Sequence, residues 1–278
     1  MVLGAVVIAA ALGGLMFAAQ RSREGALTHQ QGMRLVLWAG GVVPTVVLLT
    51  LLIATLPAMR PIAVKPDDLR ITVTGEQFWW RIRYQPAGQA AIDDSNELRV
   101  PVGRNVELLL EAGDVLHSFW VPGLAGKLDM VPGRTNKLVV HATRAGRFRG
   151  QCAEFCGLSH ALMAFDVVAM EPAAFDAWLA ARRTSAPVGG EGARLFAANG
   201  CGGCHTVAGV SGGTIGPNLT HLGARASLGA GMQKLTHAHL VRFIREAPTV
   251  KPGARMPAYP QMTNDDAATI ARWLEQLK

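Results

Sequence analysis

Two stretches of this sequence combine residue types that bind metals. The first is Cys201 to His205 (CGGCH). A Cys-x-x-Cys-His run is the attachment pattern of c-type haem, in which both thiols add to vinyl groups and the adjacent imidazole ligates the iron. A zinc site would need a second close Cys/His pair, and a thioredoxin-like pair would need a βαβ pattern; the surrounding sequence has neither. We therefore predict a covalent haem c held by Cys201, Cys204 and His205.

The sixth ligand of such a haem comes from the other side of the ring, further along the chain. Methionine in this position stabilises ferrous iron and raises the reduction potential. Met256, in the run ARMP, is the predicted ligand. Met262 and Met232 are the competing candidates, and we expect both to be packing residues.

The second stretch, residues 152–163 (CAEFCGLSHALM), is called the cysteine loop below. It places Cys152, Cys156, His160 and Met163 within twelve residues, a soft ligand set that favours copper. A mononuclear blue-copper site needs only one cysteine, so the second thiolate implies either zinc or two metals that share bridging sulfurs. A disulfide between the two cysteines is the structural alternative. It would leave the histidine and the methionine unexplained.

A copper site of this kind also takes a histidine from a neighbouring loop. His117, in the run DVLHSFWVP, is the predicted upstream ligand. His141 lies within an alternating apolar run, which indicates an ordinary surface or core histidine.

The elements that must position the cysteine loop are strands. Between Leu69 and Met170 short runs of alternating apolar and polar residues recur, separated by proline and glycine pairs. This pattern predicts a β-sandwich. The predicted strands are 69–73, 78–84, 106–110, 115–121, 137–142 and 164–170. Residues 172–183 then read as a helix with proline in its first turn, and residues 184–190 (TSAPVGG) as a linker.

After the linker the periodicity becomes helical. Residues 191–199 predict a short helix that ends at Gly200, and residues 238–247 predict another that Pro248 stops. A last helix is expected after the N-cap Thr263. Its predicted buried face consists of Ala267, Ile270, Ala271, Leu274 and Leu277.

The N-terminus differs from the rest of the chain in charge. The 278 residues are 50% hydrophobic and 17% charged, but residues 2–19 and 35–59 carry no charge at all. Each run is long enough to cross a membrane, so residues 1–60 predict a two-helix transmembrane hairpin. Arg21, Arg23 and Arg34 outnumber Glu24 in the connecting loop, which places that loop in the cytoplasm and the remainder outside. Cleavage of residues 2–19 as a signal peptide is the alternative, although no basic residue precedes the run.

The charge distribution excludes one class of function. The net charge is +7, but the basic residues are scattered rather than gathered in a stripe. Nucleic-acid binding requires a clustered basic surface. We therefore expect no nucleic-acid partner.

Together these motifs resemble subunit II of the haem–copper cytochrome c oxidases, whose binuclear copper centre is called CuA. The resemblance is carried by the cysteine loop and by residues 114–136 (DVLHSFWVPGLAGKLDMVPGRTN), while residues 191–278 resemble a class I cytochrome c. It covers essentially the whole chain. It implies a cupredoxin-like Greek-key sandwich over residues 61–183 and an all-α cytochrome c domain over residues 191–278.

The resemblance also assigns roles within the two sites. It makes Cys152 and Cys156 the bridging thiolates of a copper pair. The remaining copper ligands it implies are His117, His160, Met163 and the backbone carbonyl of Glu154. The Glu154 carboxylate would face the catalytic subunit and help to hold magnesium, and the carbonyl of Pro217 would fix the tautomer of His205.

Two positions bear on the proton and electron paths of the family. The family often has a glutamate at a proton path where this chain has Leu35. The family's aromatic electron port lies in the run 77–80 (QFWW). Alternation puts Phe78 and Trp80 on one face, so we expect Trp80 in the core and Trp79 as an exposed electron port.

The expected function is electron input to a respiratory terminal oxidase. Electrons from a cytochrome c or a quinol–cytochrome c reductase would pass through haem c and CuA to a haem–copper subunit I, with subunit III beside it in the inner (cell) membrane. Oxygen reduction, coupled to proton translocation, would take place in that partner. A haem–copper site needs histidines inside the membrane, and the predicted spans of this chain hold none, since His29 is expected in the loop. The alternatives are the equivalent subunit of a CuA-containing nitric oxide reductase and a membrane-tethered electron shuttle.

Overall fold

The structure is a computed structural model that describes residues 9–14, 16–17, 28–59, 62–183 and 189–278. Its contacts divide the chain into two compact units, Met1–Ile62 and Ala63–Lys278.

The N-terminal unit contains one long apolar helix. It runs from His29 to Thr55 through α2 (His29–Leu35), a π-helical segment (Val36–Val42) and α3 (Val43–Thr55), and a 3-10 turn (Leu56–Met59) follows. The helix has 27 residues, and its 18-residue apolar window has a mean hydropathy of 2.3. At about 1.5 Å per residue it is long enough to cross a bilayer. Among the described residues it is the one helix that meets this test.

The first predicted span falls largely outside the described residues. Of residues 2–19 only 9–14 and 16–17 are described, and they are helical. The hairpin therefore stays a prediction. The prediction that His29 lies in the loop is wrong, because Thr28 is the N-cap of α2 and His29 is the first residue of that helix. Thr28 and Gln31 form a capping box in which the Gln31 side chain accepts a hydrogen bond from Thr28 N at 3.0 Å.

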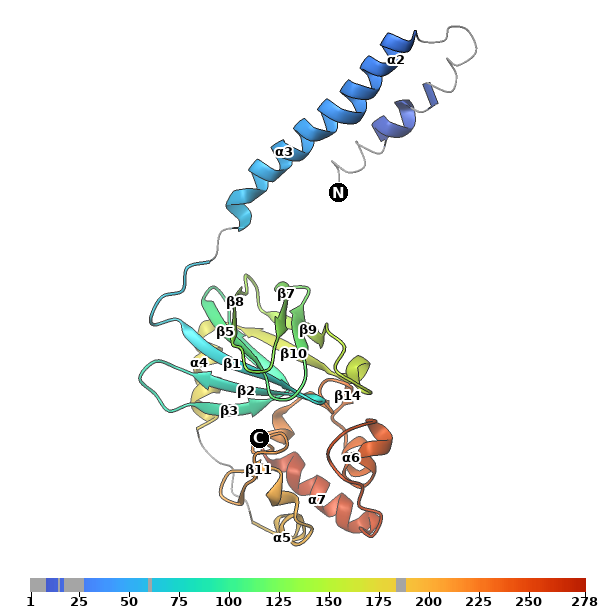
Figure 1. Cartoon of the computed structure of the whole chain (residues 1–278). Helices are drawn as coiled ribbons and strands as arrows, with labels where there is room; N and C mark the ends of the chain where they lie inside the picture. The colour runs from blue at the N-terminus through green and yellow to red at the C-terminus, as the bar shows by residue number, and fades with distance from the viewer. Residues whose placement is uncertain (1–8, 15, 18–27, 60–61, 184–188) are drawn as a thin grey trace. The chain divides into compact units, whose positions relative to one another are not determined.

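The second unit begins with a sandwich of two five-stranded sheets (Figure 1), ordered β3-β2-β1-β5-β8 and β4-β10-β9-β6-β7. Alternation buries one side chain in two, as at Leu69, Ile71 and Val73, and these side chains form the core. The strands are β1 (Leu69–Glu76), β2 (Trp79–Gln85), β3 (Ile92–Ser95), β4 (Glu97–Pro101), β5 (Asn105–Ala112), β6 (His117–Val121), β7 (Ala125–Met130), β8 (Asn136–His141), β9 (Gly146–Cys152) and β10 (Ala164–Met170).

This architecture confirms the predicted β-sandwich and adds four strands that the sequence pattern did not indicate. β3 and β4 carry the buried acids Asp94 and Glu97 at positions where an apolar residue is expected. β7 and β9 each have one or two buried residues and contain glycine together with lysine in β7 and arginine in β9. Helix α4 (Pro172–Ala181) follows with proline in its first turn, as predicted.

The C-terminal part, residues 189–278, is called the helical domain, and residues 63–183 the sandwich domain. The helices of the helical domain are α5 (Glu191–Ala198), α6 (His237–Val250) and α7 (Asn264–Gln276). Thr263 caps α7, and all five residues of its predicted buried face are buried. Pro248 does not stop α6 as predicted: the backbone kinks at Glu246 and the helix resumes through Pro248 to Val250.

The helical domain is not purely α-helical. Two short β-ladders pair β11 (Thr206–Val207) with β12 (Ser211–Gly212), and β13 (Ser227–Leu228) with β14 (Gln233–Lys234). The second pair closes around residues 229–231, three consecutive residues with positive φ. Short 3-10 turns complete the two domains at His160–Leu162, Cys201–Gly203 and Leu222–Ala224.

Candidate metal centres

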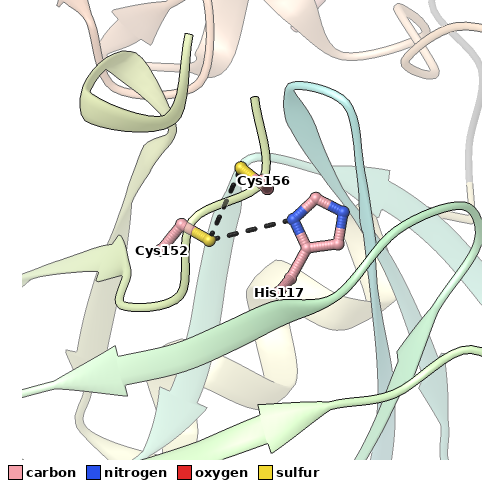
Figure 2. Close-up of side chains that lie close together, drawn as sticks. All are labelled: His117, Cys152 and Cys156. Atoms are coloured by element: carbon pink, nitrogen blue, oxygen red, sulfur yellow. Dashed lines mark hydrogen bonds between the residues drawn. The ribbon is translucent and has the colours of Figure 1, made fainter. Parts of the chain in front are cut away.

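The side chains of His117, Cys152 and Cys156 converge in the sandwich domain (Figure 2). The Cys152 Sγ atom lies 3.8 Å from His117 Nδ1 and 3.8 Å from Cys156 Sγ. All three residues are buried. Both cysteines are free thiols, so the predicted alternative of a disulfide between them is excluded.

The remaining predicted copper ligands lie around the same two sulfurs. His160 Nδ1 is 3.6 Å and Met163 Sδ 3.8 Å from Cys156 Sγ. The carbonyl oxygen of Glu154 is 3.2 Å from Cys152 Sγ. The structure thus brings together every residue that the sequence singled out for this site. His141, by contrast, lies on the surface, where its Nδ1 is 2.8 Å from Asn105 Oδ1.

Strand pairing explains why these residues meet. β6 pairs antiparallel with β9, so that Phe119 lies opposite Cys152 and the start of β6 faces the beginning of the cysteine loop. The loop then turns back through a 3-10 turn, and Cys152 N donates to the carbonyl of Met163 at 2.9 Å. Gly75 leaves room for the imidazole, since a Cβ there would lie 2.8 Å from His117 Cγ. Strand pairing therefore places His117 and Cys152, and the turn of the cysteine loop brings Cys156, His160 and Met163 back to them.

The electrostatics of the cysteine pair suit a cation. Hydrogen bonding between the two thiols lowers the pKa of Cys152 and raises that of Cys156, so the pair holds one negative charge. Burial works against a charge on His117, but its bonds to Cys152 and Asp114 outweigh this and raise its pKa. A buried anionic sulfur pair between two imidazoles and a thioether fits soft metal ions.

Asp114 is a functional residue that sequence reasoning did not single out. Its Oδ1 lies 2.9 Å from His117 Nε2, and its Oδ2 accepts from Gln77 N at 2.8 Å. A carboxylate on one imidazole nitrogen leaves the other nitrogen free as a ligand and fixes the ring. The three-residue spacing between Asp114 and His117 is visible in the sequence, but spacing alone does not show that the chain folds back there.

The predicted haem ligands line one apolar cavity that is formed mostly by the helical domain and bordered on one side by Phe78 and Trp79 of the sandwich domain. Cys201, Cys204, His205 and Met256 all border it, among side chains such as Phe196 and Leu274. Burial lowers the pKa of His205, so the ring stays neutral. Its Nδ1 donates to the carbonyl of Pro217 at 2.8 Å, which leaves Nε2 as the ligating atom. The residues present therefore fit a covalently attached haem with histidine as one axial ligand.

The two competing methionines lie elsewhere. Met262 is 3% exposed and belongs to the hydrophobic core of the helical domain. Neither Met262 nor Met232 borders the cavity, whereas Met256 does. The geometry therefore favours Met256 as the second axial ligand.

Trp79 departs from its predicted exposure. The prediction from alternation is confirmed for Trp80, which is fully buried in the sandwich core, while Trp79 lies on the other face of β2. However, Trp79 is only 9% exposed, because the helical domain covers this face of β2 and Trp79 borders the same cavity as His205. The Arg81 guanidinium packs over its ring at 4.8 Å. Trp79 is thus an internal residue rather than an exposed port.

A cupredoxin-like sandwich with a buried cysteine pair, joined to a cytochrome c domain, defines a class of membrane-anchored electron-transfer proteins. Residues 84–170 match the cytochrome c oxidase subunit II periplasmic domain family, and residues 190–278 match the cytochrome c family. Cytochrome c oxidase subunit 2 of Alkalihalophilus pseudofirmus is 39% identical over 249 residues, which are 85% of this chain and 71% of that protein. The chain belongs to the cytochrome c oxidase subunit II family.

One further relative agrees with this assignment, and a solved structure is similar to part of this chain. Cytochrome c oxidase subunit 2 of Bacillus subtilis is 32% identical over 84% of this chain and 69% of its own length. The crystal structure of the periplasmic domain of cytochrome oxidase subunit II of Bradyrhizobium japonicum is 31% identical, with a TM-score of 0.40, and covers 44% of this chain and 97% of that one. Family membership identifies an electron-input subunit of an oxidase complex with a catalytic subunit as partner, and it implies haem c and copper binding.

Proposed function

We propose that this chain passes electrons from an external donor, through haem c and then a binuclear CuA centre, to the haem–copper site of a partner subunit that reduces oxygen and translocates protons. The observation that carries the proposal is the convergence of all six predicted copper ligands around the buried sulfurs of Cys152 and Cys156. A mononuclear site would need only one of the two thiolates. Because the chain also bears a haem attachment motif, it holds two one-electron centres in series.

The roles of the individual residues follow from their positions. Cys152 and Cys156 would bridge two copper ions. Those ions would also be bound by His117, His160, Met163 and the carbonyl of Glu154. The Glu154 carboxylate, which is half-buried, would share a magnesium ion with the catalytic subunit. A rigid sulfur-bridged site suits electron transfer because its potential is set by ligands and burial.

We further propose that two spans anchor the chain in the inner (cell) membrane, with both metal domains on the periplasmic side. The helix from His29 to Thr55 supports the second span by its length and hydropathy. The excess of Arg21, Arg23 and Arg34 over Glu24 favours a cytoplasmic connection between the two spans. Subunit I, and subunit III beside it, would then receive electrons from the outer face.

Metal analysis of the purified membrane complex tests this function. We expect two coppers in this chain for each covalent haem, measured after correction for the copper of the catalytic subunit. One copper or a zinc ion in the cysteine loop would contradict the binuclear site. Oxygen consumption with a reduced cytochrome c as donor should accompany the expected metal content.

One observation favours a second candidate, electron input to a nitric oxide reductase. Leu35 stands where the oxidases often have a glutamate at a proton path, and its side chain is 57% exposed on the long apolar helix. A chain that feeds an enzyme without proton pumping would not need that glutamate. Comparing oxygen with nitric oxide turnover by the same complex separates the two functions.

A further inference from the structure

The helical domain makes three hydrogen bonds to residues 159–164, which form the end of the cysteine loop and the first residue of β10. Ser159, which is fully buried, donates through Oγ to the carbonyl of Pro252 at 2.6 Å. The Lys251 ammonium donates to the carbonyl of Leu162 at 3.1 Å. The amide of Ala164 donates to the carbonyl of Ala230 at 2.9 Å. These contacts flank His160 and Met163, so both proposed copper ligands lie between points where the helical domain holds the chain.

Lys251 is the centre of this arrangement. It is 3% exposed, and besides Leu162 its Nζ donates to the carbonyls of Phe78 at 2.7 Å and Gly229 at 2.6 Å. An ammonium has three protons, and here each has one acceptor. Two of the acceptors belong to the sandwich domain and one to the helical domain. Lys251 therefore joins three chain segments that are distant in sequence.

The burial of a lysine at this point is costly. Desolvation lowers the pKa of Lys251 to about 7 from an ordinary value of 10.5. No carboxylate pairs with it among the described residues. A residue whose only role was to fill space would not need an ammonium, since an apolar chain of the same length avoids this desolvation. The three carbonyls indicate a specific role in holding backbone.

The turn at residues 229–231 supplies the other contact. Gly229, Ala230 and Gly231 have φ values of 64°, 61° and 71°. This left-handed backbone brings the turn against β10, where a Cβ on Gly231 would lie 3.2 Å from the carbonyl carbon of Ala164. The turn thus approaches the residue that follows Met163 backbone to backbone.

We infer that the helical domain is part of the framework of the copper site, with Lys251 as the positioning residue that fixes the backbone before Met163 and also holds the turn 229–231, which fixes the backbone after it. The inference rests on the proposed role of Met163 as a copper ligand. Ser159 and the turn 229–231 make the other two contacts. Because these hydrogen bonds hold the backbone, they determine where the Met163 thioether and the His160 imidazole lie relative to the two cysteine sulfurs.

The test uses Lys251→Met in the purified full complex. Methionine keeps an unbranched side chain of nearly the same length and loses all three N–H donors. Lys234→Met is the matched control, since Lys234 is an exposed lysine of the same domain. The two readouts are hydrogen exchange of peptides that cover residues 158–165, and the absorption and paramagnetic resonance spectra of the copper centre.

With both metals bound, we expect exchange in residues 158–165 to be about tenfold faster in Lys251→Met, together with altered copper spectra. Lys234→Met should match the wild type in both readouts. Unchanged exchange and unchanged spectra in a fully metallated Lys251→Met complex would overturn the inference.

A second variant covers the case in which Lys251→Met fails to fold. Ser159→Ala removes one hydroxyl donor to Pro252 and should raise the exchange of the same peptides with a smaller spectral change. If this variant behaves as the wild type, the inference is wrong. A wild-type complex that contains no copper would refute the proposed function instead, and the exchange comparison would still decide whether Lys251 holds the loop.

Discussion

The two metal centres of this chain are built in different ways. In the sandwich domain, paired strands bring buried ligands together, and the sulfur atoms and imidazoles already face one another at 3.6–3.8 Å. In the helical domain, Cys201, His205 and Met256 border an apolar cavity that the side chains do not fill. The fold therefore brings the copper ligands together by itself, whereas a bound haem would fill the cavity and complete the hydrophobic core of the helical domain.

This difference predicts the largest effect, which concerns folding. Replacing both haem-attachment cysteines (Cys201→Ser with Cys204→Ser) should leave the cavity empty and unfold residues 191–278, because an unfilled core of this kind is unstable. Cys156→Ser should remove the copper and leave the sandwich folded. Limited proteolysis of the two variants measures this, and a protease-resistant haem-free domain would break the comparison.

A smaller effect is expected at the axial ligand of the haem. Met256→Leu should keep the covalent haem, abolish the methionine–iron absorption band and lower the reduction potential by on the order of 0.1 V. Met262→Leu is the control, since that side chain packs in the core. An unchanged methionine–iron band in Met256→Leu would contradict the assignment and mean that another residue is the second ligand of the iron.

The next effect sharpens the view that the sheet organises the copper ligands. Asp114→Asn removes the carboxylate that holds His117 Nε2 at 2.9 Å, so copper should dissociate about 10-fold to 100-fold faster. The exposed Asp129→Asn serves as a control. Transfer of copper to a strong chelator, followed by absorbance, gives the rate. Equal rates in the two variants would mean that strand pairing alone fixes the ring.

The smallest effect is a dependence of stability on pH. Glu97 is buried, yet bonds from Arg147 and Arg99 hold its pKa below the ordinary 4.5. A carboxylate with a lowered pKa stabilises the folded state above that ordinary value and loses this contribution as the pH falls through the folded pKa. Glu97→Gln should therefore lower the free energy of unfolding by about 2 kcal/mol at pH 7 and flatten its decline in acid. Parallel denaturant titrations at pH 7 and pH 4 measure both effects.

Features that depend on local pattern could be read from the sequence. Alternation predicted β1 and β10, and the N-cap Thr263 with its apolar stripe predicted α7. The cysteine loop and His117 were identified because few other chemistries explain these residue types at this spacing. The structure then placed them together.

Features that depend on contact between distant segments could not be read in this way. Asp94 lies in a strand without an apolar pattern. Its buried carboxylate is paired with the guanidinium of Arg225 in the helical domain, 2.7 Å away, and the sequence pattern of the strand does not show this partner. Trp79 was expected to be exposed because the pattern of one strand does not reveal that another domain covers it. Lys251 has no sequence signal at all, since a buried lysine is recognised only by the carbonyls around it.

Paramagnetic resonance of the oxidised complex tests the central claim most directly. If Cys152 and Cys156 bridge two copper ions, the unpaired electron is shared and its hyperfine splitting arises from two equivalent copper nuclei. Splitting from a single copper nucleus, or no copper signal from this chain, would contradict the account.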